Sequence, residues 1–363
     1  MDSFAFIIHP IHPKRDVSRK YPLLGKYLTE RQINFFSTFF PPVYISEIEG
    51  ITSKATGKQI QGWFLACPLT PTRMVELPEK TVYRKIIEAG RLAERLGAKT
   101  LGLGAFTSVI GDAGITIANE LDIPVTTGDS YTVAIAVQAT QKAAQKLEIP
   151  LQNATAAVVG ATGAIGQVCA HKLAEKVSEL YIIGQRKPAL EVLREQIQSV
   201  TGLSNIHIST EVDDIKKTHL IITVTSAIGP IIHPEHLQSG SIICDVARPR
   251  DVSTRVAAVR DDVLVIDGGM VDVPGSVDFH FDFGFPPGKA YACMAETMAL
   301  ALEGRFEDYT LGKDLRLEQV NEIEAIADKH GFRLSGFRSF EKAVTDEQIE
   351  CVRQYARQHP QFI

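Results

Sequence analysis

Cysteine is scarce in this chain, and its spacing is irregular. The 363 residues include five cysteines, and no two of them form a CxxC pair. An odd number of widely spaced cysteines argues against a disulfide framework and against a zinc site, so we expect no bound metal. The same cysteine usage fits a reducing compartment, and we therefore expect a cytoplasmic protein.

Long apolar runs and a large excess of one charge are also absent. No stretch reaches the roughly 18 apolar residues expected of a membrane-spanning helix. The first ten residues lack the basic region and long apolar run of a signal peptide, so we expect none. The formal net charge is -5, which argues against a nucleic-acid partner. Hydrophobic residues make up 45 % of the chain, which is enough for a large core.

Strand and helix patterns divide the chain into three expected regions. At roughly 100–200 residues per domain, this length allows two or three domains. The first region, residues 1–150, begins with a mixed segment and continues with alternating strands and helices, including an amphipathic helix over Glu79–Leu96. We expect this region to be an α/β domain, and the family resemblance that segments along the chain carry implies that it binds the substrate. The last region, residues 288–363, has a mainly helical pattern.

The middle region, residues 151–287, has the strand–helix rhythm of a doubly wound, mostly parallel sheet of the Rossmann type. Six strands are expected there, with helices between most of them: Ala154–Val159, Glu179–Ile183, Ile206–Ser209, Leu220–Thr225, Ser241–Asp245 and Val263–Asp267. The predicted fold class is therefore α/β, with a Rossmann-type domain between an N-terminal α/β substrate domain and a helical C-terminal segment.

The first of these strands runs into a glycine-rich sequence, Gly160-Ala-Thr-Gly-Ala-Ile-Gly166. The first glycine permits a tight turn, the second lets the backbone approach a pyrophosphate, and the third lets helix and strand pack closely. The N-terminus of the following helix faces the phosphates. We expect a dinucleotide site formed by Gly160, Thr162, Gly163, Ala164, Ile165 and Gly166. The simpler alternative is a glycine-rich turn without a ligand.

Two cations at the end of the second strand favour NADPH as the cofactor. NAD sites place an acidic residue about 20 residues after the glycine loop, where it binds the ribose 2′-hydroxyl. Here Arg186 and Lys187 follow the strand instead, and they can pair with a 2′-phosphate. Solvated surface cations are the alternative. After the fourth strand, Thr225 and Ser226 are expected to line the nicotinamide side of the crevice, unless they are ordinary loop residues.

Cys293 is the first candidate for a covalent nucleophile. It lies near the start of an expected helix, where the helix N-terminus lowers the pKa of a thiol, and Lys289 is expected to contribute. A cysteine can carry an acyl group as a thioester, which a hydride reduces to an aldehyde. From these residues alone, a structural role as a small core residue is more common for such a cysteine than a catalytic role. Cys67 is the second candidate nucleophile, His280 is a candidate acid/base or structural group, and His9 is expected in a turn.

Segments along most of the chain resemble the cyanobacterial long-chain fatty acyl-acyl-carrier-protein reductases. The matching segments are Arg15–Arg19, Pro41-Pro42, Thr52–Lys58, Gly104–Ser108, Thr126–Gly128, Val158–Gly166, Ala292–Glu296, Glu303-Gly304 and Lys329–Phe332. The segments around Cys293 and Gly104–Ser108 are much more specific than the glycine loop, which many dehydrogenases share. The resemblance implies an enzyme that uses NADPH to reduce an acyl thioester to a fatty aldehyde, with the acyl group carried on Cys293.

The resemblance also implies a substrate cleft and partners. The cleft would be lined by Thr107, Ser108, Thr126, Thr127 and Gly128. The acyl donor would be a thioester of acyl-carrier protein or coenzyme A, and an aldehyde-deformylating oxygenase would consume the product. The aromatic cluster Phe35–Phe40 leaves three locations open: the core, an acyl tunnel, or a peripheral contact with a membrane.

Two other hypotheses stay open. One is a dehydrogenase of the shikimate or amino-acid type without a covalent step, which commonly relies on a Lys/Asp pair. Lys99 and Asp129 are present, but they do not lie in a motif typical of that pair. The other is a non-catalytic NADPH sensor or scaffold, which would bind the cofactor without turning over a substrate.

Overall fold

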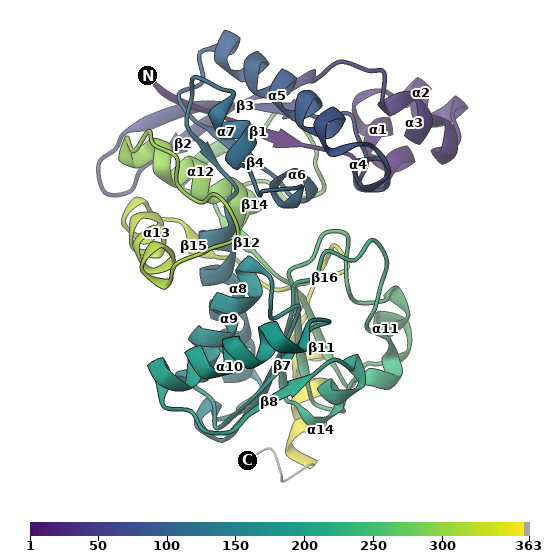
Figure 1. Cartoon of the computed structure of the whole chain (residues 1–363), viewed down its shortest axis with the longest axis vertical. Coiled ribbons are helices and arrows are strands. Elements are labelled where there is room, and N and C mark those ends of the chain that lie inside the picture. The colour runs from purple at the N-terminus through teal and green to yellow at the C-terminus, as the bar shows by residue number, and fades with distance from the viewer. Residues whose placement is uncertain (359–363) are drawn as a thin grey trace. The chain divides into compact units, whose positions relative to one another are not determined.

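The computed structural model describes residues 1–358 and contains two compact units (Figure 1). The first unit comprises Met1–Tyr131 and Val271–Arg333, and the second comprises Thr132–Met270 and the chain from Leu334. This division differs from the expected regions 1–150, 151–287 and 288–363, because the chain enters the second unit within one helix and returns to the first at residue 271. Residues 359–363, the end of the expected helical segment, lie outside the described residues.

The first unit is built on a mixed six-stranded sheet in the order β13–β2–β3–β1–β4–β5. Its strands are β1 (Asp2–Ile8), β2 (Val43–Thr52), β3 (Gln59–Ala66), β4 (Leu101–Leu103), β5 (Val125–Thr126) and β13 (Gly275–Asp278). Strand β1 is parallel to β3 and β4, whereas β2 is antiparallel to β3 and β13. Its helices are α1 (Pro13–Lys20), α2 (Pro22–Tyr27), α3 (Glu30–Ser37), α4 (Pro71–Glu76), α5 (Glu79–Leu96), α6 (Phe106–Val109), α7 (Ile115–Asn119), α12 (Ala292–Glu303) and α13 (Leu317–His330).

Strand β1 lies inside this sheet, although the sequence pattern did not predict it. Residues 3–7 are all buried, so the strand does not alternate between apolar and polar side chains. The predicted helix Glu79–Leu96 is confirmed as α5, which ends at Gly97 with a φ of 86°.

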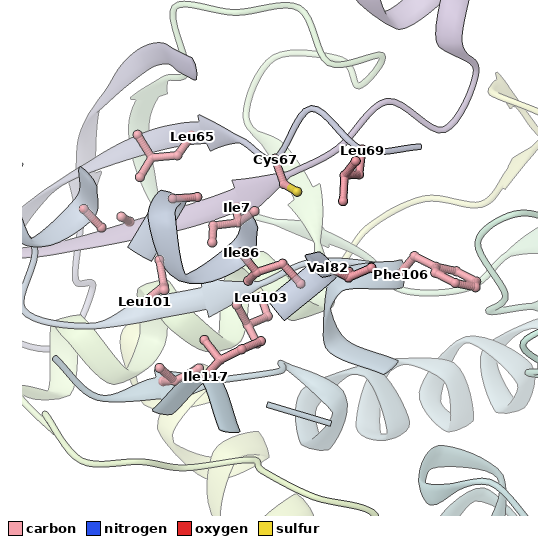
Figure 2. Packing of buried hydrophobic residues seen from close by; sticks show 14 of the residues in the cluster. Ile7, Leu65, Cys67, Leu69, Val82, Ile86, Leu101, Leu103, Phe106 and Ile117 are labelled. Carbon is pink, nitrogen blue, oxygen red and sulfur yellow. The ribbon is translucent and has the colours of Figure 1, made fainter. Parts of the chain in front are cut away.

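The core of the first unit joins residues of the sheet to residues of α5. Figure 2 shows Ile7 from β1, Leu65 from β3, Leu101 from β4 and Ile86 from α5 within one buried cluster. Cys67 belongs to the same cluster, and burial raises the pKa of its thiol to about 12. The second candidate nucleophile is therefore a structural core residue.

The second unit contains an all-parallel sheet in the order β11–β10–β9–β6–β7–β8. Its strands are β6 (Thr155–Val159), β7 (Glu179–Ile183), β8 (Ile206–Ser209), β9 (Leu220–Thr223), β10 (Ile242–Asp245) and β11 (Leu264–Asp267). The first strand lies between the second and the fourth, which is the strand order of the Rossmann fold. All the predicted strands are present, and the predicted α/β fold class is confirmed. The helices that follow are α8 (Asp129–Lys146), which the chain uses to enter this unit, α9 (Ala164–Ala174), α10 (Lys187–Thr201), α11 (Thr254–Val259) and α14 (Asp346–Gln358).

Of the expected C-terminal segment, α12 and α13 belong to the first unit, and residues 334–358 belong to the second. Phe340 lies against the hydrophobic cluster of that unit, and the Arg353 Nε donates a hydrogen bond of 2.8 Å to the carbonyl of Lys146. Residues 334–358 are helical in α14, but short strands lie near the start of this stretch and in the region just before α12. These are β12 (Met270–Asp272), β14 (Lys289–Tyr291), β15 (Arg333–Leu334), β16 (Arg338–Ser339) and β17 (Lys342–Ala343). Among the described helices, none combines the length and the apolar character needed to span a bilayer.

Replacing Ile7 by alanine should destabilise the first unit. Ile7 is fully buried, and a cavity of this kind lowers the free energy of unfolding by about 2–5 kcal/mol. Trp63, the only tryptophan, packs against the same cluster, so its fluorescence during a urea titration reports on this unit. The control Val75→Ala removes a side chain that is 55 % exposed and should leave the midpoint unchanged. If the urea midpoint of Ile7→Ala equalled that of the wild type, the buried packing of Ile7 in this cluster would be contradicted.

Candidate functional site

The glycine loop joins β6 to α9 in the second unit. Its backbone geometry explains why two of its positions are occupied by glycine. Gly160 has a φ of 84°, and a Cβ there would lie 2.4 Å from the carbonyl oxygen of Val224. A Cβ on Gly166 would lie 2.2 Å from the carbonyl oxygen of Gly160. A side chain at Gly160 would therefore push the loop away from the chain that follows β9, and a side chain at Gly166 would separate the first turn of α9 from the loop.

The N-terminus of α9 offers amide groups to an anion. The helix starts after Gly163, which has no side chain with which to cap it. The first N–H groups of a helix have no partner within the helix, and here they belong to Ala164, Ile165 and Gly166. Such groups bind pyrophosphate together with the helix dipole. The loop and the start of α9 therefore fit the phosphates of a dinucleotide.

Arg186 and Lys187 lie where β7 gives way to α10, and both are exposed. The end of β7 is close to the glycine loop, because a Cβ on Gly184 would lie 3.5 Å from the Oγ1 of Thr162. No carboxylate follows β7 before the helix begins. These residues fit a ribose 2′-phosphate better than a 2′-hydroxyl.

Thr225 is held by a buried carboxylate that the sequence analysis missed. Its Oγ1 donates a hydrogen bond of 2.5 Å to Asp251, and its N–H donates one of 2.9 Å to the same carboxylate. Thr223 also donates to Asp251, at 2.6 Å. Burial raises the pKa of Asp251, and these hydrogen bonds act against that rise. Ser226, by contrast, is exposed.

Further charged groups gather at the carboxyl ends of β10 and β11, the edge where Rossmann folds bind ligands. Asp245 accepts a hydrogen bond of 3.0 Å from the N–H of Val252, and burial raises the pKa of its carboxyl to about 7. Arg250 forms an ion pair with Asp267 at the end of β11. The sequence offers one indication of this charged group, the segment Val246–Asp251, which contains several charged residues directly after a buried strand.

Cys293 is the second residue of α12, and its surroundings belong to the first unit. Its side chain is only partly exposed, and the backbone N–H groups of Met294 and Ala105 lower the pKa of its thiol. Gly128 lies directly against it, since a Cβ on Gly128 would be 2.3 Å from both the Cα and the Cβ of Cys293. Gly128 also has a φ of 77°, so two separate constraints require glycine there.

The loop that carries Ala105 is held in an unusual conformation. Ala105 has a φ of 47° and a ψ of -120°, which residues with a Cβ avoid. The Oγ1 of Thr107 donates to the carbonyl of Gly104 at 2.8 Å, and the Oγ of Ser108 donates to the carbonyl of Ala105 at 2.7 Å. Thr107 and Ser108 were both predicted to line the substrate cleft. Their hydroxyl groups instead donate hydrogen bonds within the loop that carries Ala105.

His9 supports the same loop, and its expected place in an ordinary turn was wrong. The ring is buried, and its Nε2 accepts a hydrogen bond of 3.0 Å from the N–H of Phe106. Burial lowers the pKa of His9 to about 4, so the ring is neutral and can accept this hydrogen bond. His280 lies elsewhere in the unit, exposed beside Asp278 and Glu49.

A buried glutamate connects α12 to the segment that carries Gly128. Glu296 accepts hydrogen bonds from the Thr126 hydroxyl at 2.5 Å, the Thr310 hydroxyl at 2.7 Å and the N–H of Tyr131 at 2.8 Å. Thr127, between these contacts, donates its N–H to the carbonyl of Thr310 at 2.9 Å. Burial raises the pKa of Glu296, and the hydrogen bonds oppose that rise.

Two carboxyl groups therefore lie near the candidate nucleophile. Burial, and then the charge of Glu296, raises the pKa of Asp129 to about 7. Burial, and then the charge of Asp129, raises the pKa of the Cys293 thiol to about 12. The expectation that the helix N-terminus leaves a low pKa is wrong, because burial and nearby negative charge dominate. Lys289 is not among the main causes of this shift: it precedes the helix, in β14, and forms an ion pair with Asp272.

Comparisons with known proteins found one matching family and two related sequences. Residues 141–267 match the family described as shikimate/quinate 5-dehydrogenase. The chain is 31% identical over 97% of its length to the aminotransferase PigE of a Serratia species, although it spans only 42% of that relative. It is 27% identical over 91% of its length to the long-chain acyl-[acyl-carrier-protein] reductase of Synechococcus elongatus, and it covers 98% of that protein.

Solved dehydrogenases show weaker likeness. L-Tryptophan dehydrogenase from Nostoc punctiforme matches with a TM-score of 0.42 and 13% identity, over 98% of this chain and 87% of that one. Quinate dehydrogenase from Corynebacterium glutamicum, in complex with NAD, matches with a TM-score of 0.37 and 9% identity, over 90% of this chain and 98% of that one. TM-scores this low do not establish a shared overall fold. The nucleotide-binding fold of the second unit follows from its own strand order and glycine loop.

Replacing Asp129 by asparagine should make Cys293 more reactive toward iodoacetamide. Removing the negative charge lowers the pKa of the thiol, so at a pH of about 8 alkylation should be faster by about three- to tenfold. At a pH of about 5 the wild-type Asp129 is itself protonated, and the two rates should converge. Peptide mapping separates Cys293 from Cys351, which is also partly exposed. The exposed Asp122→Asn serves as the control, and an unchanged rate in Asp129→Asn would contradict this electrostatic coupling.

Proposed function

We propose that this protein is an NADPH-dependent oxidoreductase that reduces a long-chain fatty acyl thioester to the aldehyde through an acyl group carried on Cys293. The observation that carries the proposal is the setting of this cysteine in the first turn of α12, with the Gly128 backbone directly against it. The similarity to the Synechococcus elongatus reductase supports it along 91% of the chain. The acyl donor is a thioester of acyl-carrier protein or coenzyme A.

Asp129 is the proton acceptor in this proposal. A thiol with a raised pKa is a weak nucleophile until a base takes its proton. Because its own pKa lies near 7, the Asp129 carboxyl exchanges protons at neutral pH. The Cys293 sulfur then forms a bond to the acyl carbon, the bond from that carbon to the carrier sulfur breaks, and the carrier leaves as a thiol with the proton that Asp129 held. Asp129→Asn would therefore slow acyl transfer while it speeds alkylation.

The residues of the second unit would hold the cofactor. The pyrophosphate would bind to the Gly160–Gly166 loop and the α9 N-terminus, and Arg186 with Lys187 would bind the 2′-phosphate. Thr225, fixed by Asp251, and Ser226 would border the nicotinamide. When bound, NADPH supplies the hydride that converts the Cys293 thioester to an aldehyde. The backbone N–H groups of Met294 and Ala105 would favour release of the aldehyde, because they stabilise the sulfur as a thiolate leaving group.

The experiment that tests the proposal separates acyl transfer from reduction. The purified protein is incubated with palmitoyl-acyl-carrier protein, and separately with palmitoyl-coenzyme A, without NADPH. The intact mass should rise by one acyl group, which hydroxylamine removes and which peptide mapping assigns to Cys293. Adding NADPH should release the aldehyde. Cys293→Ser should form no thioester adduct while it still binds NADPH, whereas Cys351→Ser should behave as the wild type.

A second candidate is a dehydrogenase of the shikimate type without a covalent step, which the family match over residues 141–267 favours. That match lies entirely in the second unit and does not include Cys293. Absence of an acyl adduct with either donor, together with no NADPH oxidation over the thioesters, would overturn the first proposal. Oxidation of a hydroxy acid or amino acid that persists after thiol alkylation would establish the second.

The cofactor preference is tested by removing both cations after β7. The double variant Arg186→Ala/Lys187→Ala should weaken NADPH binding by about tenfold or more, because the 2′-phosphate loses its charged partners. NADH binding should change by less than about twofold, since NADH has no 2′-phosphate. Fluorescence titration of each dinucleotide measures both constants, with the exposed Arg255→Ala as control. Equal losses for NADPH and NADH would show that these cations do not select the cofactor.

A further inference from the structure

The first three helices of the chain expose an unusual amount of apolar surface. Of the 18 large hydrophobic side chains that are exposed among the described residues, nine lie between positions 21 and 44. They are Tyr21, Leu23, Leu24, Tyr27, Phe35, Phe36, Phe39, Phe40 and Tyr44. Isolated exposed apolar residues are ordinary, but a concentration of this kind marks a binding surface. We call residues 13–44 the α1–α3 surface.

The helices of this surface are packed together, and their apolar side chains remain outside. Helix α1 packs against α2 and α3, so the three form one feature of the first unit (Figure 1). Helix α3 buries Ile33 and Ser37 on its inner face. The ring of Phe35 lies 5.4 Å from that of Phe36 and 5.6 Å from that of Phe39, yet all three stay exposed. Of the three locations left open for the Phe35–Phe40 cluster, the core is therefore wrong.

The same surface is positively charged in an otherwise acidic chain. Residues 13–44 contain six lysines and arginines but only two acidic residues, whereas the whole chain has a net charge of -5. Lys14, Lys26 and Arg31 are among its exposed cations. An anionic surface would attract this region and repel the rest of the molecule, and that difference would orient the protein.

An anionic bilayer fits these side chains better than an acidic protein does. Leu23, Tyr27 and Phe39 are 70%, 73% and 69% exposed, so they project into solvent rather than line a groove. A protein partner would need a matching pocket for each projecting group, whereas the lipid interface accepts them without one. Lysines and arginines beside such groups keep their charges at the lipid headgroups while their aliphatic stems lie along apolar surface.

We propose that the α1–α3 surface docks this protein on an anionic lipid bilayer, with its exposed Phe and Leu side chains in the interface and its cations on the headgroups. The contact is peripheral and reversible. It does not depend on the proposed function, because docking requires neither cofactor nor substrate.

The test is flotation of the full chain with vesicles. Vesicles of phosphatidylcholine containing about 30 mol % phosphatidylglycerol should carry the protein upward, and vesicles of phosphatidylcholine alone should carry much less. Binding to the anionic vesicles should fall in about 0.5 M salt, because the headgroup contacts are screened. The variant Phe35→Glu/Phe39→Glu should bind at least about tenfold more weakly. Trp63 fluorescence verifies that the variants remain folded.

The control adds the same two charges at exposed apolar positions elsewhere. Val192 and Val200 on α10 are 54% and 66% exposed, and Val192→Glu/Val200→Glu should float as the wild type does. Failure of the wild type to bind anionic vesicles would overturn the proposal, as would an equal loss in both double variants. Crosslinking of Phe39-region residues to an acidic acyl-carrier protein, without vesicle binding, would assign the surface to a protein partner instead.

Discussion

The hydrogen bonds of the buried Glu296 carboxylate hold the surroundings of Cys293 together. They join α12 to Thr126 at the end of β5, to Tyr131 in the first turn of α8, and to Thr310 in the chain after α12. An unpaired carboxylate in this position would be very costly, so these segments cannot separate independently. Gly128 lies between two of the anchored residues, which explains why its backbone stays in contact with Cys293.

The same arrangement makes the resting cysteine unreactive. Burial and two nearby carboxyl groups favour the thiol over the thiolate, and the peptide donor from Ala105 only partly opposes them. Oxidants and electrophiles react with the thiolate, so a cysteine of this kind is protected until its proton has an acceptor. The backbone of Ala105 is strained, and such conformations persist only where surrounding contacts enforce them. They cluster at active sites, which agrees with a functional site beside Cys293.

Local patterns in the sequence predicted the strands and the glycine loop of the second unit and α5 of the first unit, but they missed β1. Strands such as Glu179–Ile183 are short apolar runs between helices, and the glycines of the following loop have backbone tasks that spacing alone reveals. Strand β1 was not predicted because both of its faces are buried, so its sequence does not alternate between apolar and polar residues. The pairing of Thr126 with Glu296 spans 170 positions, and no local pattern encodes such a contact. The pKa of Cys293 was predicted in the wrong direction because burial raises it most, and the largest charge effect comes from Asp129, which is distant along the chain.

The crossing of the chain between its two units has a consequence for biosynthesis. The first unit needs α12, α13 and β13, which follow the whole Rossmann sheet in the sequence, and the second unit needs α14, which comes last. A nascent chain that has emerged as far as Lys146 therefore presents β2 without its neighbour β13 and α8 without the carboxylate of Glu296. Open strand edges of this kind invite mispairing until β13 and α12 have been synthesised. Neither unit can be excised as one continuous fragment.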